Sequence, residues 1–237
     1  MPESLGNDLL VLVPGWVCDS CNNTCSAFES RALSLSILGV ERCRLGVVTK
    51  KRRPARASLC GVEWFAEPTK TANVVSAEAD WSRIPMLLKP DGSGTLVFPV
   101  HDDSNVDVCR LLLKLGVELF GIIHHFDGVN PDLSDARAFV LGRDAKPWPY
   151  FILRTPEPPP KLVSVLHEDP DSHEYIKSCG FDLFLHEFGS ELVLLFQYGA
   201  FIGAAAVTSR NTTWTKEFRE WNTPFVGCPV EFAGLHG

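Results

Sequence analysis

The segment 105–123, NVDVCRLLLKLGVELFGII, contains the longest helical pattern in the chain. Its apolar residues recur every three or four positions, as they do on one side of an α-helix. These residues are Val108, Leu111, Leu112, Leu115 and Leu119. Lys114 and Glu118 stand one helical turn apart and predict a supporting ion pair. A second, shorter helix is expected over 134–141, with Ser134 as its N-cap.

Short apolar runs that are separated by turn residues predict β-strands on both sides of this helix. Before the helix, the clearest runs are 59–67, 72–77 and 94–100. After it, the runs lie at 162–168, 181–188, 191–199 and 200–207. Turn residues at Gly189, Ser190 and Gly199 favour antiparallel neighbours. The sequence therefore predicts an α+β protein with one long helix and an antiparallel sheet.

Composition is that of a globular protein, with 45% hydrophobic and 22% charged residues. The N-terminus lacks a basic region of the signal-peptide type, and the apolar run 199–207 is too short to cross a bilayer. Eight cysteines in 237 residues are too few for a disulfide scaffold. We therefore expect a cytoplasmic protein with no membrane partner, in a compartment where thiols stay reduced.

Charge is distributed unevenly along the chain, whose net charge is −7. Residues 1–60 hold eight Lys or Arg and five Asp or Glu, a net charge of +3, whereas residues 61–237 hold fourteen and twenty-four, a net charge of −10. The total disfavours a general polyanion binder, but the basic N-terminal part is typical of local nucleic-acid contact. The oligomeric state is not predicted.

The segment 49–56, TKKRRPAR, holds five cations, and Pro54 blocks a continuous helix through it. We interpret it as an exposed arm that contacts DNA phosphates, and a solvated linker is the alternative. The predicted nucleic-acid-binding residues are Lys50, Lys51, Arg52, Arg53 and Arg56. Upstream, residues 26–38 predict a helix with Ser26 as N-cap, Glu29 three residues on, and Gly39 as the stop.

Cys18 and Cys21 form a Cys-x-x-Cys pair just ahead of that helix. Two thiolates at this spacing can bind one tetrahedral Zn²⁺, although a structural site needs four ligands. Cys25, Cys43 and Cys60 lack the spacing of a partner pair. The alternative is a pair of small, partly buried cysteines in a turn. A thioredoxin-like redox motif fits the sequence less well than these two alternatives, because no βαβ pattern surrounds the cysteine pair.

Residues 2–6, PESLG, and 17–23, VCDSCNN, followed by a helix, resemble the HNH endonuclease family, in the branch whose ββα metal site is laced by a zinc knuckle. The resemblance covers about the first 40 residues. It is looser over 109–121, 137–140 and 147–151, which are similar to the downstream region of bacterial HNH proteins.

The resemblance implies that Cys18 and Cys21 are half of a structural zinc knuckle and that Asn22 is a ligand of a catalytic Mg²⁺ or other divalent ion. No catalytic residue carries over, because the family's Glu-His pair would stand just before Met1 in this register. We therefore expect either a misplaced start codon or a degenerate remnant. In either case the zinc site and the magnesium site are incomplete as written.

The resemblance also implies a function, which is metal-dependent phosphodiester hydrolysis of DNA, impaired by the missing Glu-His half. The alternatives are a non-catalytic nucleic-acid-binding or regulatory protein, and an interaction module whose cysteines are merely packed. The expected organisation is a partial HNH-like ββα segment over 1–45, a basic linker over 46–57 and an acidic α+β domain over 58–237, with a recognition or regulatory role for the last.

Overall fold

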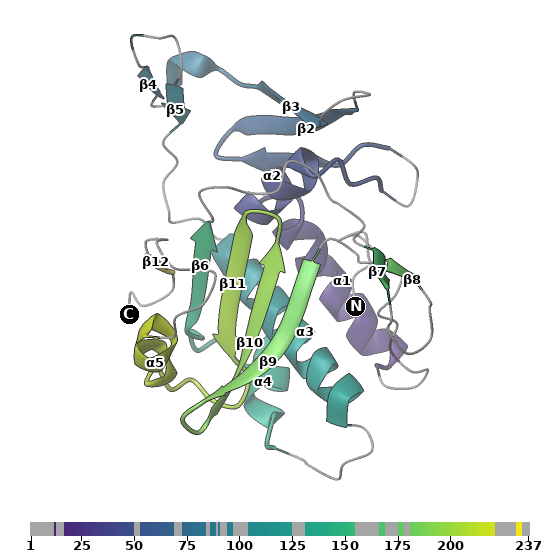
Figure 1. The fold of residues 1–237 in the computed structure, drawn as a ribbon, viewed down its shortest axis with the longest axis vertical. Coiled ribbons are helices and arrows are strands. Elements are labelled where there is room, and N and C mark those ends of the chain that lie inside the picture. The colour runs from purple at the N-terminus through teal and green to yellow at the C-terminus, as the bar shows by residue number, and fades with distance from the viewer. Residues whose placement is uncertain are drawn as a thin grey trace.

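A computed structural model gives the fold of the chain (Figure 1). It describes residues 12, 17–49, 53–68, 73–83, 86–88, 90, 94–96, 104–124, 131–154, 166–168, 175–177, 181–220 and 231–233. Helices and antiparallel sheets both occur in these ranges, so the predicted α+β class is confirmed.

The largest sheet has five strands in the order β12-β6-β11-β10-β9, and all neighbours are antiparallel. The strands are β6 (Tyr150–Arg154), β9 (Phe181–Phe188), β10 (Glu191–Tyr198), β11 (Phe201–Ala206) and β12 (Glu231–Ala233). The consecutive strands β9, β10 and β11 are the predicted meander, with φ of 61° at Gly189 and 58° at Gly199 in its turns.

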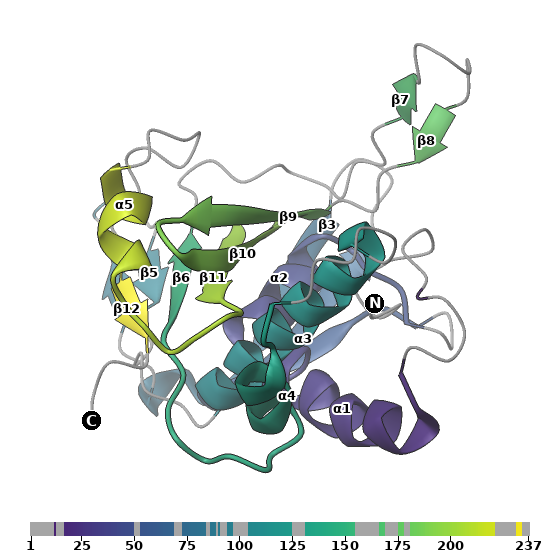
Figure 2. The same cartoon turned by 90° about the horizontal axis from the view of Figure 1, so that it is seen from below.

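The described part of one predicted strand, the run 162–168, does not belong to the five-stranded sheet. Among the described residues, strand β7 (Leu166–Glu168) pairs with β8 (Tyr175–Lys177) in a separate two-stranded sheet. Figure 2 shows this hairpin well away from the five-stranded sheet. The five-stranded sheet instead contains β6 and β12, which were not predicted as strands.

Helix α3 (Ser104–His124) crosses one face of the five-stranded sheet, as Figure 2 shows, and confirms the predicted long helix. The helix approaches the sheet closely at Gly116, where an added Cβ would meet the Val207 side chain. Helix α5 (Trp214–Glu220) packs on the other face. Because successive residues of a strand point to opposite faces, Leu194 joins the α3 cluster and Leu195 the α5 cluster.

The N-terminal helices differ from the prediction of one helix over 26–38. Helix α1 (Asp19–Ala32) begins earlier, because the Cys18 sulfur accepts the backbone N–H of Cys21 at 3.3 Å and acts as the N-cap. A second helix, α2 (Ile37–Arg44), is capped by the Ser36 hydroxyl. Gly39 lies inside α2 and does not end a helix.

Gly39 is explained by close packing. An added Cβ there would stand 2.9 Å from the Leu33 carbonyl oxygen and 3.0 Å from the Ala57 Cβ. Helix α2 also reaches the five-stranded sheet, because Glu41 Oε1 accepts the backbone N–H of Ala200 at 2.7 Å in the β10–β11 turn. The small residue lets α2 lie against its neighbours, and the carboxylate joins it to the sheet.

A smaller three-stranded sheet lies against α2 and stands above it in Figure 1. Its strands are β1 (Arg56–Leu59), β2 (Val62–Pro68) and β3 (Asn73–Glu78). Beyond it come the 3-10 turn η2 (Trp81–Arg83) and the hairpin of β4 (Met86–Leu88) and β5 (Gly94–Leu96). Cys60 and Gly61 have φ of 52° and 78° and form the two-residue turn between β1 and β2, as a type I′ hairpin requires.

Helix α4 (Ser134–Val140) confirms the second predicted helix, with a different start. Leu133 occupies the N-cap position, and Asp132 Oδ1 accepts the Ser134 backbone N–H at 2.9 Å. The aspartate therefore satisfies the backbone N–H of Ser134 itself, and the predicted N-cap role of Ser134 is wrong.

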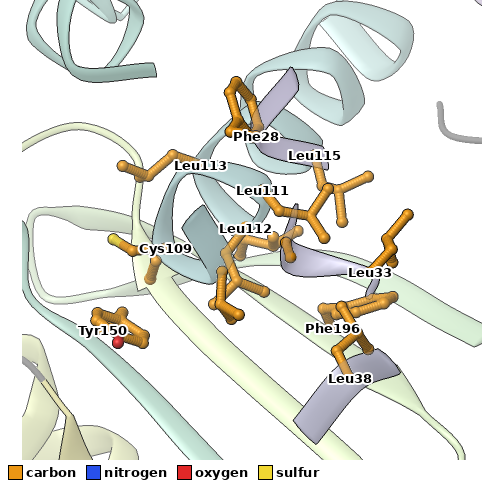
Figure 3. Packing of buried hydrophobic residues seen from close by; sticks show 14 of the residues in the cluster. Phe28, Leu33, Leu38, Cys109, Leu111, Leu112, Leu113, Leu115, Tyr150 and Phe196 are labelled. Atoms are coloured by element: carbon orange, nitrogen blue, oxygen red, sulfur yellow. The ribbon is translucent and has the colours of Figure 1, made fainter. Parts of the chain in front are cut away.

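The main core joins α1, α2, α3, α4 and the five-stranded sheet. Figure 3 shows Phe28 of α1 beside Leu111 and Leu115 of α3, with Leu38 of α2 near Phe196 of β10. Each of these side chains is at most 2% exposed. Residues of the predicted N-terminal segment and of the predicted acidic domain thus pack into one cluster.

Candidate functional site

Helix α1 is bound to α3 by two sets of charged side chains. Lys114 Nζ lies 2.9 Å from Glu29 Oε1 and 2.5 Å from Glu118 Oε1, and all three side chains are largely buried. Arg31 donates to both carboxylate oxygens of Asp107, at 2.6 and 2.9 Å. The predicted Lys114–Glu118 pair is confirmed, but Glu29 of α1 adds a second carboxylate.

The charge state of Lys114 follows from these neighbours. Burial by itself lowers the pKa of Lys114, but the carboxylates of Glu118 and Glu29 outweigh it, so the pKa is raised above its ordinary value. The amine is therefore held as a cation within the α1–α3 interface. Its charge offsets the two carboxylates that face it.

A cavity of about 420 Å³ opens beside this interface, between α1, α3 and α4. Its walls are largely apolar, and three thiols, those of Cys18, Cys21 and Cys25, line one side because they recur at helical spacing. We call this space the thiol-lined cavity. Cys25 is buried, and burial raises its pKa to about 11.

Cys18 is electrostatically different from its neighbours. The Cys21 thiol and the Cys21 backbone N–H both donate to the Cys18 sulfur, and the two bonds lower the pKa of the exposed Cys18. Donation by the Cys21 thiol raises the pKa of Cys21. Sequence reasoning identified the pair but not the N-cap role of Cys18, since cysteine is not among the usual capping residues.

The donor set around the pair tests the predicted metal sites. An N–H bond to the first sulfur suits half of a knuckle, since it favours the thiolate that zinc needs. However, the described residues contain no group of three or more His, Cys, Asp or Glu side chains that could hold an ion. Cys18 and Cys21 supply two of the four ligands that a structural zinc site needs.

Asn22, the predicted ligand of the catalytic ion, lies exposed in the first turn of α1. Asn22 is not among the residues that line the thiol-lined cavity. Ser26 and Ser30, one and two turns further along α1, line a second space.

This second space is a groove of about 890 Å³ on the other side of α1, and we call it the arginine groove. Its lining residues come from α1, α2, the segment 49–54, β1 and β2. They are Ser26, Glu29, Ser30, Leu33, Ser34, Arg42, Thr49, Arg53, Pro54, Arg56 and Phe65. The lining contains three arginines and one carboxylate, Glu29, which is already paired with Lys114.

Backbone hydrogen bonds join the two described ends of the predicted basic arm. The backbone N–H of Thr49 donates to Arg53 O at 2.8 Å, and that of Ala55 donates to Val47 O at 2.9 Å. Val47 and Ala55 are buried. Arg53 lines the groove beside these bonds, and Arg56 follows at the start of β1. Of the predicted nucleic-acid-binding residues, Lys50, Lys51 and Arg52 lie outside the described residues.

Arg42 is one of the groove residues that sequence reasoning missed. It is only 6% exposed, and its Nη1 donates to the Leu33 carbonyl oxygen at 2.7 Å. Burial lowers the pKa of Arg42, although its ordinary value is so high that the group stays charged. An arginine in the helical segment 37–44 carries no signal of this role, because only the fold brings it beside Arg53 and Arg56.

Among the helices that the structure describes, none combines the length and the apolar character needed to cross a membrane. Comparison with known proteins gives no match: no family model, no curated protein and no solved structure is similar to this chain.

Proposed function

We propose that this chain is a cytoplasmic DNA-binding protein related to the HNH endonucleases, and that the arginine groove binds the sugar–phosphate backbone. The observation that carries the proposal is the gathering of Arg42, Arg53 and Arg56 around one space together with serine and threonine hydroxyls. Guanidinium groups and hydroxyls are the donors that proteins use most on phosphate oxygens. The one carboxylate in the lining, Glu29, is paired with Lys114, which also pairs with Glu118.

The distribution of charge along the chain also favours the arginine groove as the DNA-binding surface. Residues 61–237 carry a net charge of −10, which repels a polyanion, whereas residues 1–60 carry +3. A local positive field on an acidic molecule orients an approaching nucleic acid toward the basic side. The groove is formed mainly by residues 26–56, within the basic part of the chain.

Metal-dependent hydrolysis of DNA is the second candidate. It is favoured by one observation, the Cys18–Cys21 turn at the start of α1 with Asn22 directly after it. In this candidate, zinc is held by Cys18 and Cys21, and Mg²⁺ by Asn22, each with ligands from outside the described residues. The printed sequence contains no match to the family's Glu-His pair, so DNA binding is the function proposed first.

The primary proposal is tested by the double variant Arg53→Gln/Arg56→Gln. Binding of fluorescein-labelled DNA, single-stranded and duplex, is measured by anisotropy from 50 to 300 mM salt. We expect roughly tenfold weaker binding at the lowest salt. The slope of log K against log salt should fall by about 0.7 for each lost phosphate contact with a single strand, or about 0.9 with a duplex.

The matched control is Arg137→Gln/Arg143→Gln, which removes the same charge at exposed positions outside the groove. It should change affinity much less than the groove variant. Equal losses in the two variants, or no binding of either DNA by the unmodified protein, would overturn the proposal.

The second candidate is tested by atomic emission of the purified protein. One zinc per chain, lost on Cys18→Ser or Cys21→Ser, supports a completed knuckle, because a structural zinc needs both thiolates. A zinc content near zero contradicts it and leaves DNA binding as the proposed function.

A further inference from the structure

The three-stranded sheet presents an aromatic side chain to the arginine groove. Phe65 of β2 is the register partner of Arg56 in β1 and of Ser76 in β3. Residues directly opposite each other in antiparallel strands lie on the same face of a sheet, with their Cβ atoms about 5 Å apart. Arg56, Phe65 and Ser76 therefore form one row across the sheet, and its first two members line the groove.

The opposite face of this sheet is committed to the core. Ala57, Leu59 and Val62 are buried, and Trp64 packs against the main cluster. Phe65 points to the other side because side chains alternate along a strand. It is only partly buried and belongs to neither hydrophobic cluster of the described residues. The fold thus uses Trp64 for packing and leaves Phe65 at the groove wall.

An aromatic ring beside arginines has a specific use in nucleic-acid recognition. Bases stack on exposed rings at about 1–3 kcal/mol per base, while basic side chains follow the backbone. In a duplex, the base faces are covered by neighbouring base pairs and do not reach a protein ring. A ring that lies within the phosphate-binding groove therefore favours an unpaired strand.

From this arrangement, we infer that the arginine groove binds single-stranded DNA, with one base stacked on Phe65 and the adjacent phosphates on Arg53 and Arg56. This inference rests on the proposed DNA-binding function and specifies its ligand. The hydroxyl of Ser30 also lines the groove and can donate to a phosphate oxygen, whereas the Ser26 hydroxyl donates to the Asn23 carbonyl oxygen at 2.8 Å.

The test compares Phe65→Leu with Trp81→Leu, which removes an aromatic side chain that is 43% exposed and does not line the groove. Anisotropy with a labelled 12-nucleotide oligothymidine and with a 12-base-pair duplex gives the two affinities. Phe65→Leu should weaken single-strand binding about tenfold, because it removes the stacking surface. It should leave duplex binding within twofold, and Trp81→Leu should change neither affinity.

A second variant, Phe65→Trp, keeps a ring at the position and guards against a folding defect in the leucine variant. It should bind the oligothymidine at least as tightly as the unmodified protein, and its added indole fluorescence should be quenched on binding, since stacking brings the base onto the ring. Circular dichroism checks the fold of each variant.

The outcomes separate this inference from the proposed function. Equal affinity for both DNAs that depends on Arg53 and Arg56 but is unchanged by Phe65→Leu would overturn the single-strand inference and leave DNA binding intact. Failure of both DNAs to bind would overturn the proposed function, and with it the inference.

Discussion

The two sides of α1 differ in nearly every physical property. Toward α3, the helix buries Cys25, Phe28 and Ala32 and places Glu29 against a buried lysine. Toward the arginine groove, it presents Ser26 and Ser30, whose side chains are exposed. One helix of 14 residues thus separates a packed, charge-paired interface from an open, basic one.

From this difference we expect the α3 side of α1 to contribute mainly to stability and the groove side mainly to ligand binding. Buried apolar area stabilises a fold, and removing one partner of a buried ionic group is costly because it leaves the other partner's charge buried. Exposed hydroxyls and arginines contribute little to stability and stay available to a ligand. Substitutions on the α3 side should therefore affect unfolding, and substitutions on the groove side should affect DNA binding.

The largest effect is expected for Lys114→Met, which removes the cation between Glu29 and Glu118. Two carboxylates would then lie in a largely buried site without the lysine cation that pairs with both. Breaking a buried pair in this way costs about 3–5 kcal/mol, and urea unfolding followed by circular dichroism measures it.

Its companion is the triple variant Lys114→Met/Glu29→Leu/Glu118→Leu, which removes all three charges together. Apolar replacement of a whole buried ionic group is often neutral, so the triple variant should recover most of the stability. A loss below 1 kcal/mol for Lys114→Met alone would show that the α3 side is more hydrated than its burial indicates.

The second-largest effect is expected for the rates at which the thiols of Cys18 and Cys25 react with an alkylating reagent. Burial raises the pKa of Cys25 to about 11, so at pH 8 only about one molecule in a thousand carries its thiolate. The pKa of the exposed Cys18 is lowered instead. Iodoacetamide should therefore modify Cys18 at least a hundredfold faster than Cys25, as read by peptide mass spectrometry.

The pH dependence sharpens this contrast. From pH 8 to pH 9 the rate at Cys25 should rise about tenfold, because its thiolate fraction lies far below saturation. The rate at Cys18 should rise less, since its thiol is closer to full ionisation. Comparable rates at the two cysteines would mean that the thiol-lined cavity opens readily to solvent.

The smallest effect is expected on the groove side, for Ser30→Ala. The serine is exposed, and alanine is the better helix former. The free energy of unfolding should therefore stay within about 0.5 kcal/mol of the original or rise slightly, in the same urea assay. A loss above 1 kcal/mol would show that this side is packed as well, and would break the contrast between the two sides of α1.

The long helix and the meander were predictable because their signals are local. The apolar positions of α3 recur with the helical period, and β9, β10 and β11 are strong runs closed by tight turns at Gly189 and Gly199. Nothing distant has to be known to recognise either pattern. The Cys60–Gly61 hairpin was not predicted, because 59–67 was expected as one run and most of β1 lies before it.

Features that depend on tertiary contacts were missed. Gly39 was expected to end a helix because glycine usually does so, whereas it serves a close approach to Leu33 and Ala57. Helix α5 spans only two turns and carries too short a pattern to predict. The arginine groove combines residues from five segments, so its composition follows only from the fold. The HNH resemblance indicated the cysteine pair but not Arg42 or Phe65.

The hydrogen bond from the Ala200 backbone N–H to Glu41 has a consequence for folding during synthesis on the ribosome. Donor and acceptor are 159 residues apart, and a ribosome adds about 5–20 residues per second. Glu41 therefore emerges roughly 8–30 s before the turn that it caps can exist. During that interval the five-stranded sheet is still incomplete, so the joining of α2 to it is a late event of biosynthesis.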